Sequence, residues 1–310
     1  MTTHTRRYGR RAPKRAPAIQ FSRVRRGTAT PPAHPTAADN LALLKGGWAL
    51  LGNDVAGDCV AVTWANVRRL VTAILGAREV YPTQDEVWAV YKTQNPKFNP
   101  NGTAATNGPG SKYDEGMDIQ TLLEYLVKVG GPDGVKALAF AQVNPQSVED
   151  VKAALAIFGY VWTGINVLEI NQEEFADEQP WDYSRTSPDD GGHSVITGGY
   201  GAPGAGPLGG DERFITWAEE TSFTDNYWRR EVEEAWVVIW PEHLQDKTFL
   251  AGVDVAALAA DYTAITGKPF PAVIPPQPTP TPTPTPAPTV DQNVLAAYQH
   301  LQTWYREQGV

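Results

Sequence analysis

Apolar side chains recur every three or four residues in three stretches of the first half of the chain, and this spacing predicts three helices with one buried face each. The stretches follow Asp58, Thr83 and Asp118, residue types that commonly cap helix N-termini. Thr83 also has a glutamate three residues later, which completes a capping-box pattern. Because the first stretch ends at Gly76, it predicts a long buried helix with Cys59 in its first turn.

The second half begins with one more short helical pattern and then changes to runs rich in β-branched and aromatic residues, which predict strands. Helices followed by strands is the order of an α+β fold, in which the first helix lies against a later antiparallel sheet. Loops rich in Gly, Asn and Pro are expected at residues 97–113 and 201–211. The predicted helix covers residues 148–157, and the predicted strands cover residues 160–168, 194–199, 213–217 and 236–240.

Composition divides the chain into four parts. Residues 1–38 are basic and then rich in Pro, Thr and Ala, which predicts a largely disordered arm without a core of its own. Residues 39–273 form the expected folded domain. Residues 274–289 alternate Pro and Thr, as in an extended polyproline-II linker. Residues 290–310 carry an apolar stripe at helical spacing, so we expect an amphipathic helix that docks either on the body or on a protein partner.

The charge is unevenly distributed. The chain has a net charge of -9, but residues 1–26 hold nine Lys or Arg and no acid, which leaves -18 on the rest. An acidic body is not typical of nucleic-acid readers, although the arm could contact phosphates, an acidic partner surface or its own body. No apolar stretch follows the basic start and none is long enough to span a membrane. We therefore expect a soluble protein without a signal peptide, in the cytoplasm or in a virion.

The chain has one cysteine, Cys59, which cannot form an internal disulfide. A lone cysteine is most often a small core residue. The first turn of a helix, however, lowers the pKa of a thiol, because unpaired backbone N–H groups favour the thiolate. The preceding residues 52–58 are polar and turn-prone, which predicts that the thiol opens onto a cleft. Cys59 is therefore a candidate nucleophile.

A nucleophilic thiol needs a base, and of the five histidines only His193 lies in an informative setting. Two glycines precede it and a predicted strand follows, so its ring could face the start of the Cys59 helix. The remaining histidines are expected at the surface: His4, His34, His243 and His300. No Cys/His set has the spacing of zinc ligands, and neither a metal nor another cofactor is expected.

The surroundings of these two residues resemble those of the papain family of cysteine peptidases. Residues 52–61 (GNDVAGDCVA) match that family's Gln-x-x-x-Cys-Gly-x-Cys-Trp-Ala segment in layout, with a polar amide six places before a cysteine that opens a helix. Residues 193–201 (HSVITGGYG) are similar to its His-Ala-Val-x-x-Val-Gly-Tyr-Gly strand. The separation of the cysteine and the histidine, 134 residues, also fits. The resemblance covers about residues 45–240 and implies a two-lobed fold, with a helical N-terminal lobe and an antiparallel β C-terminal lobe.

The resemblance also implies roles for individual residues. Cys59 would attack an acyl carbon, and His193 would take its proton. Asn53, where the family has Gln, would donate to the oxyanion together with the Cys59 backbone N–H. Trp217 resembles the tryptophan that shields the family's histidine. Residues 114–118 (DEGMD) resemble the segment that forms one wall of the substrate groove.

One position departs from the family pattern. The residue that matches the family's orienting asparagine is Ile215, whose side chain cannot hold an imidazole. Thr216, Glu219 and Asp190 are the candidates to replace it, and the sequence does not choose among them. Losing this third residue weakens such a site without removing the nucleophile and base.

Three hypotheses follow. The first is a cysteine peptidase or amidase that cleaves a peptide or protein substrate through an acyl-thioester. The second is a papain-like domain retained as a structural or binding module of a larger assembly, such as a phage particle or a cell-envelope complex. The third is an unrelated α+β domain in which Cys59 is an inert core residue.

Overall fold

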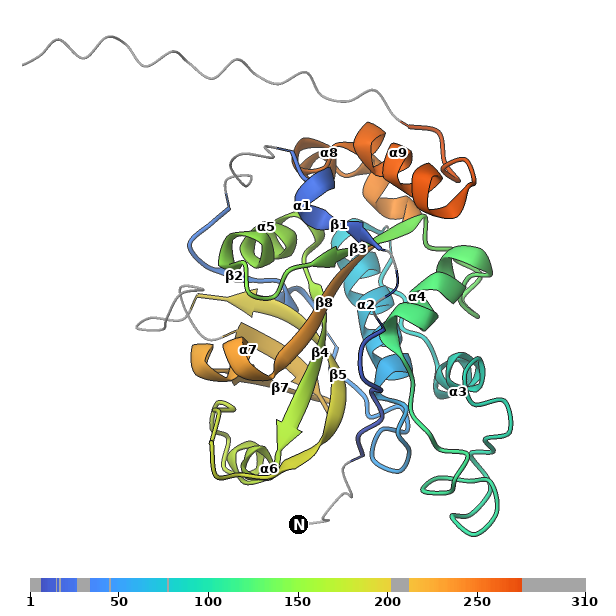
Figure 1. The fold of residues 1–310 in the computed structure, drawn as a ribbon, viewed down its shortest axis with the longest axis vertical. Coiled ribbons are helices and arrows are strands. Elements are labelled where there is room, and N and C mark those ends of the chain that lie inside the picture. The colour runs from blue at the N-terminus through green and yellow to red at the C-terminus, as the bar shows by residue number, and fades with distance from the viewer. Residues whose placement is uncertain are drawn as a thin grey trace, which may run out of the picture. The chain divides into compact units, whose positions relative to one another are not determined.

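The computed structural model describes residues 7–14, 16, 18–26, 34–44, 46–76, 78–201 and 212–274 (Figure 1). The chain separates into two compact units, Met1–Gln277 and Pro278–Val310, and every described residue belongs to the first. The predicted linker beyond residue 274, the predicted helix at 290–310 and most of the predicted loop at 201–211 lie outside the described residues.

The three helices predicted in the first half are confirmed as α2 (Cys59–Leu75), α3 (Gln84–Lys92) and α4 (Ile119–Lys128). The capping box at the start of α3 is present, and the Asp118 side chain accepts a hydrogen bond from the Thr121 backbone at the start of α4. Asp58 stands at the N-cap of α2, but its side chain makes no capping hydrogen bond. The three helices lie together on one side of the sheet (Figure 1).

The described strands form one sheet in the order β1-β3-β8-β4-β5-β6-β7, with β2 paired to β5. All pairs are antiparallel except β1 with β3. The predicted strands correspond to β4, β5, β6 and β8, and the α+β fold is confirmed. The strands are β1 (Ile19–Gln20), β2 (Ala38–Asp39), β3 (Ala139–Val143), β4 (Val161–Leu168), β5 (Asp189–Tyr200), β6 (Glu212–Thr216), β7 (Glu219–Phe223) and β8 (Val232–Ile239).

Further helices cover the sheet and its edges. The predicted helix at 148–157 is α5, and it packs beside β3, β4 and β5. α8 and α9 follow the last strand, and α9 contacts α1 and β1 (Figure 1). The remaining described helices are α1 (Phe21–Val24), η1 (Leu41–Leu43), α5 (Val148–Phe158), α6 (Glu169–Ala176), α7 (Asp225–Glu231), η2 (Pro241–Gln245), α8 (Lys247–Gly252) and α9 (Val255–Thr266).

A chain of buried hydroxyl contacts ties α2 to β5. The Ser194 hydroxyl donates to Thr63 at 3.1 Å, and the Trp162 indole donates to Ser194 at 2.8 Å. Thr63 in turn donates to the Cys59 carbonyl at 2.9 Å. The start of α2 is therefore fixed against the strand that carries the candidate base.

The expectation that residues 1–38 form a largely disordered arm is wrong for residues 18–26. These residues form β1 and α1, and Ile19, Phe21 and Val24 are buried in the core. Arg25 pairs with Asp150 at 2.6 Å, with both side chains buried. The basic composition of residues 1–38 gave no indication of this short apolar motif. Burial of its side chains stabilises the segment by more than the conformational entropy that is lost when the segment becomes ordered.

His243 also departs from expectation, since it is fully buried instead of lying at the surface. Its Nδ1 accepts a hydrogen bond from the Trp240 backbone at 3.0 Å, and its ring packs on Phe158 and Phe249. Burial lowers its pKa to about 4, so it is neutral at pH 7. His243 therefore has a structural role as the N3 residue of a short helical turn.

Candidate active site

A tight turn brings the chain to Cys59. Leu51 and Gly52 both have positive φ, and the Asn53 backbone N–H donates to the Leu50 carbonyl. Asp114 accepts a hydrogen bond from the Gly57 N–H at 3.0 Å, which fixes the last residues before α2. The segment that leads into the first turn of α2 is therefore fixed by hydrogen bonds at Asn53 and at Gly57.

The Cys59 thiol is buried, with 1% of the residue exposed, so the expectation of a thiol open to a cleft is wrong for this structure. Burial raises its pKa to about 12, and the neighbouring Asp58 carboxyl adds to this rise. The Ser194 and Gly9 backbones and the Arg10 charge act in the opposite direction. The thiol is consequently neutral at pH 7, because loss of hydration outweighs the effect of the helix N-terminus.

His193 lies on β5 and is also 1% exposed. Its Nε2 shares a hydrogen bond of 2.7 Å with the Thr216 hydroxyl, and its ring stacks on Trp217 with centroids 4.9 Å apart. Burial lowers its pKa to about 3, and the Arg10 charge contributes in the same direction. Its Nδ1 has no hydrogen-bond partner among the described residues, so the ring is not hydrogen-bonded to Cys59.

Of the three residues considered for orienting the imidazole, the structure brings Thr216 to the ring. Asp190 and Glu219 are exposed, and Asp190 accepts a hydrogen bond from Gln172. Ile215 is buried opposite Ile196 in the sheet. Neighbouring residues of a strand face opposite sides of the sheet. Thr216 therefore lies on the side where His193 lies, whereas Ile215 faces the other side.

Residues 7–11, here called the strap, lie across the site. The Gly9 and Arg10 N–H groups donate to the Gly192 carbonyl at 3.2 and 2.9 Å. On the opposite side, the Gly9 carbonyl accepts from the Met117 N–H at 2.6 Å, and the Arg11 N–H donates to the Met117 carbonyl at 2.8 Å. The strap thus bridges the strand of His193 and the segment that precedes α4 (Figure 1).

At Gly9 the backbone of the strap comes closest to the backbone of the segment that leads to Cys59. A Cβ placed on Gly9 would lie 1.7 Å from the Gly57 carbonyl oxygen, and one on Gly116 would lie 2.0 Å from the Gly9 carbonyl oxygen. Backbone therefore packs on backbone here, which requires glycine at these positions. The strap passes directly beside the turn that leads to Cys59.

The strap also covers the remaining candidate residues. The Tyr8 ring meets the His193 and Trp217 rings edge-on, each at 5.8 Å between centroids. The Asn53 amide, the predicted oxyanion donor, donates to the Arg7 and Ala56 carbonyls at 3.3 Å. The sequence did not predict that the strap covers these residues, because a short Tyr-Gly-Arg segment has no hydrophobic periodicity.

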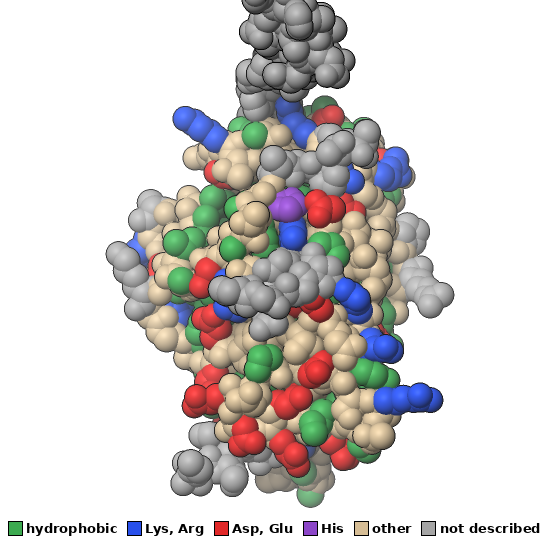
Figure 2. All heavy atoms as spheres, turned by 90° about the vertical axis from the view of Figure 1, so that its left-hand side faces the viewer, with side chains coloured by type: hydrophobic (Ala, Val, Ile, Leu, Met, Phe, Trp, Pro, Cys, Tyr) green, Lys and Arg blue, Asp and Glu red, His purple; other side chains and the backbone are tan. Residues whose placement is uncertain are grey.

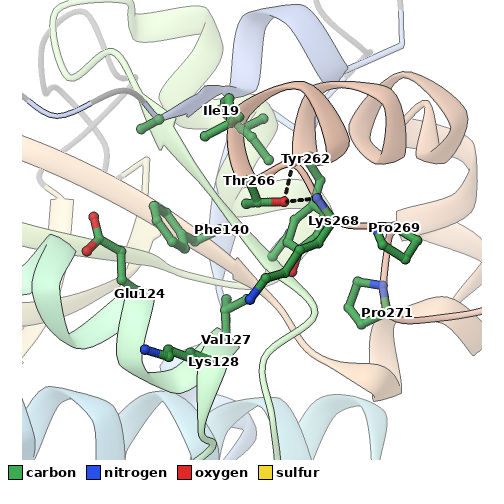
Figure 3. Close-up of a pocket in the computed structure, with 13 residues that line it drawn as sticks. Ile19, Glu124, Val127, Lys128, Phe140, Tyr262, Thr266, Lys268, Pro269 and Pro271 are labelled. Atoms are coloured by element: carbon green, nitrogen blue, oxygen red, sulfur yellow. Dashed lines mark hydrogen bonds between the residues drawn. The ribbon is translucent and has the colours of Figure 1, made fainter.

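The described residues also line an apolar cavity of about 520 Å³ away from this site (Figure 3). It lies between α4, β3, β1, α9 and the segment that follows α9, and neither Cys59 nor His193 borders it. A backbone-to-hydroxyl network of Tyr262, Thr266 and Lys268 forms one rim. This cavity is not the candidate active site.

Within the described ranges, no group of three or more His, Cys, Asp and Glu side chains is placed to hold a metal ion. No helix in the same ranges has the length and apolarity needed to cross a membrane.

No family model matches the sequence, and no curated protein matches it. Solved structures match the fold. Xylellain, a cysteine protease from Xylella fastidiosa, is 15% identical with a TM-score of 0.54, and the match covers 77% of this chain and 98% of xylellain. Procathepsin B S9 from Trypanosoma congolense is 13% identical with a TM-score of 0.51, over 76% of this chain and 86% of that one. At these identities the likeness concerns the fold alone, and the chain has the papain-like two-lobed fold that the sequence predicted.

Proposed function

We propose that this protein is a latent cysteine peptidase, with Cys59 as nucleophile and His193 as base, whose site is covered by its own strap. In the uncovered enzyme, His193 Nδ1 removes the thiol proton and the sulfur attacks the carbonyl carbon of a peptide bond. The oxyanion receives hydrogen bonds from the Asn53 amide and the Cys59 backbone N–H. The imidazolium then gives its proton to the departing amine, and water hydrolyses the thioester.

The observation that carries the proposal is the environment of His193. Its Nε2 is paired with Thr216 at 2.7 Å and its ring is stacked on Trp217, so the imidazole is held in one orientation. With Nε2–H donated to the threonine, Nδ1 carries the lone pair. That atom is buried and has no hydrogen-bond partner among the described residues, which is costly unless it serves a purpose. A base needs such a free lone pair.

Latency follows from the chemistry of the covered state. With the pKa of the thiol near 12 and that of the imidazole near 3, both groups are neutral at pH 7 and no thiolate–imidazolium pair forms. In addition, the Asn53 side-chain amide donates a hydrogen bond to the Arg7 carbonyl of the strap. Displacing the strap would rehydrate both groups and release the Asn53 amide from the Arg7 carbonyl.

The test compares alkylation of Cys59 by iodoacetamide, and hydrolysis of a fluorogenic peptide mixture, in the full chain and in Gly9→Ala. The added methyl overlaps the Gly57 carbonyl, and overpacking of about 1–3 kcal/mol should raise the alkylation rate about 5- to 150-fold. Gly47→Ala is the matched control, since a Cβ there meets nothing within 4 Å.

Within the Gly9→Ala chain, Cys59→Ala should abolish hydrolysis while leaving the melting temperature nearly unchanged. His193→Ala should lower hydrolysis by about 10²- to 10⁴-fold, as expected for loss of a general base. Hydrolysis that survives Cys59→Ala would rule out the assigned nucleophile.

The burial of Cys59 and His193, each 1% exposed, favours a second function, in which the domain is an inactive structural or binding module. For that function Gly9→Ala would alkylate no faster than Gly47→Ala, or would alkylate at a rate that His193→Ala leaves unchanged. The same set of variants therefore decides between the two.

A further inference from the structure

The strap inserts one side chain, that of Arg10, into a buried polar pocket. Its guanidinium donates to the Glu233 carboxylate at 2.7 Å and to the Glu234 carboxylate at 3.2 Å. It also donates to the Ile165 carbonyl at 3.1 and 3.3 Å and to the Asn166 side-chain oxygen at 3.0 Å. The Arg10 side chain is 1% exposed. Every group that meets the guanidinium is a hydrogen-bond acceptor.

The acceptors of the pocket belong to the sheet and not to the strap. Ile165 and Asn166 belong to β4, and Glu233 and Glu234 to the neighbouring strand β8. Other residues hold the two carboxylates: Trp236 donates to Glu234 at 2.8 Å, and Asn166 donates to Glu233 at 2.9 Å.

Gly164 leaves room for an arginine stem, because a Cβ there would lie 2.8 Å from the Arg10 Cδ and 2.5 Å from the Glu234 Cγ. The floor of the pocket is therefore shaped for a long side chain that ends in hydrogen-bond donors.

Two adjacent carboxylates need a cation when they are taken out of water. The Glu234 side chain is 1% exposed and that of Glu233 is 35% exposed. Among the described residues, Arg10 is the only cationic side chain within salt-bridge distance of either. When the strap leaves, as the proposed function requires, both carboxylates lose their partner. The open site then has a strong preference for a new cation, and a planar guanidinium reaches several acceptors at once, which an ammonium does not.

We infer that these acceptors form a specificity pocket for an arginine side chain of a peptide substrate. The inference rests on the proposed function. Tyr8 packs on the base and on Trp217, so the departing amine, which takes its proton from His193, lies on the Tyr8 side of Gly9. Arg10 lies on the other side. The pocket therefore receives the residue that precedes the one whose carbonyl carbon is attacked.

The same geometry predicts that the strap covers the site without being cut. In the strap the arginine follows the residue beside the sulfur, whereas in a substrate it would precede that residue. The strap would accordingly run through the site in the opposite direction to a substrate, and its Gly9 carbonyl accepts a hydrogen bond from the Met117 N–H.

The surface charge agrees with a basic substrate. Residues 27–310 carry a net charge of -18, and acidic side chains gather over the lower part of the face shown in Figure 2, where α6 lies. An acidic surface attracts cationic peptides and raises their rate of encounter.

The first test measures kcat/KM of the full-length Gly9→Ala chain on three 7-amino-4-methylcoumarin amides: acetyl-Arg-Gly, acetyl-citrulline-Gly and acetyl-Leu-Gly. Citrulline has nearly the shape of arginine without its charge. We expect the arginine peptide to be preferred over the citrulline peptide by about 10- to 100-fold, the range for charged hydrogen bonds. Glu234→Gln should remove most of that preference, measured as the ratio of the arginine to the citrulline kcat/KM within the same variant. Glu173→Gln, at an exposed position on α6, is the matched control.

The second test does not need catalysis. In full-length Arg10→Ala, ethylguanidinium should raise the melting temperature and an equal concentration of ethylammonium should not, and Glu234→Gln should abolish the difference. Arg10→Gln replaces Arg10→Ala if the latter does not fold. If no peptide is cleaved but ethylguanidinium binds selectively, the result supports the guanidinium pocket and contradicts the peptidase function. Cleavage without preference for arginine over citrulline, or equal effects of the two cations, would overturn the pocket.

Discussion

The N-terminal segment contacts the body at two places, and different forces hold them. Residues 18–26, here called the anchor, bury Ile19, Phe21 and Val24 in the core. The strap, in contrast, is held by backbone hydrogen bonds, one glycine crossing and the Arg10 ion pairs. Apolar burial is lost only when the core opens, whereas polar contacts respond to pH and to competing ligands. We therefore predict that the strap can leave while the anchor stays.

The largest expected effect comes from the anchor. Phe21→Ala removes a fully buried ring that packs edge-on against Phe158, and should lower the free energy of unfolding by about 3–5 kcal/mol. Chemical denaturation of the full chain measures this loss. Alkylation of Cys59 under native conditions should rise far less than in Gly9→Ala, because the strap contacts remain.

Leu43→Ala, at an exposed position, is the matched control and should change stability little. If Phe21→Ala instead exposed Cys59 as strongly as Gly9→Ala does, the anchor and the strap would be one cooperative unit and the distinction between them would fail.

Acid should loosen the strap and spare the anchor. The pKa of His193 is lowered from 6.5 to about 3 in the covered state, so the neutral ring stabilises that state above pH 6.5 and the stabilisation is lost as pH falls toward 3. Between pH 6.5 and pH 5.0 the loss is about 1.6 kcal/mol, or about 15-fold in the uncovered population, because an exposed imidazole is already half protonated at pH 6.5. Hydrogen exchange of the Gly9 and Arg10 amides, corrected for the intrinsic rate, measures it.

The anchor amides should keep their protection over the same range, because their contacts are mainly apolar. His193→Gln should make strap exchange nearly independent of pH in this window. Loss of protection throughout the molecule would point to His243, the other buried histidine, and would contradict a local opening at the strap.

The sequence predicted those parts of the structure whose signal is local. α2, α3 and α4 have apolar periodicity and N-cap residues, and β4 and β8 have β-branched and aromatic runs, so each could be identified from its own residues. β7 could not, because its Glu-Glu-Thr-Ser-Phe sequence is mostly polar and lies at the end of the sheet. The anchor was missed because its three apolar residues are dispersed among charges.

The candidate site divides in the same way. Cys59 and His193 stood out because each adjoins a recognisable turn or strand, whereas Thr216 was one of three candidates that the sequence left open. The burial of Cys59, which raises its pKa, results from the packing of distant segments, among them the strap about fifty residues away in the sequence, and the pocket for Arg10 combines β4 with β8. Contacts between segments that are distant in the sequence cannot be predicted from the local pattern of polar and apolar residues.

The smallest effect is expected from Lys14, which lies only four residues beyond Arg10 in the same basic segment. Its ammonium lies 3.9 Å from the Asp118 carboxylate and contacts the Thr121 hydroxyl, but its side chain is 56% exposed. An exposed ion pair contributes at most about 1 kcal/mol, so Lys14→Ala should change the alkylation rate of Cys59 less than about fivefold and the melting temperature hardly at all. Arg10→Ala, which removes a buried guanidinium with four acceptor groups, should have a much larger effect on both. If the two substitutions acted equally, the general attraction between a basic segment and an acidic body would hold the strap, and the geometry of the pocket would not.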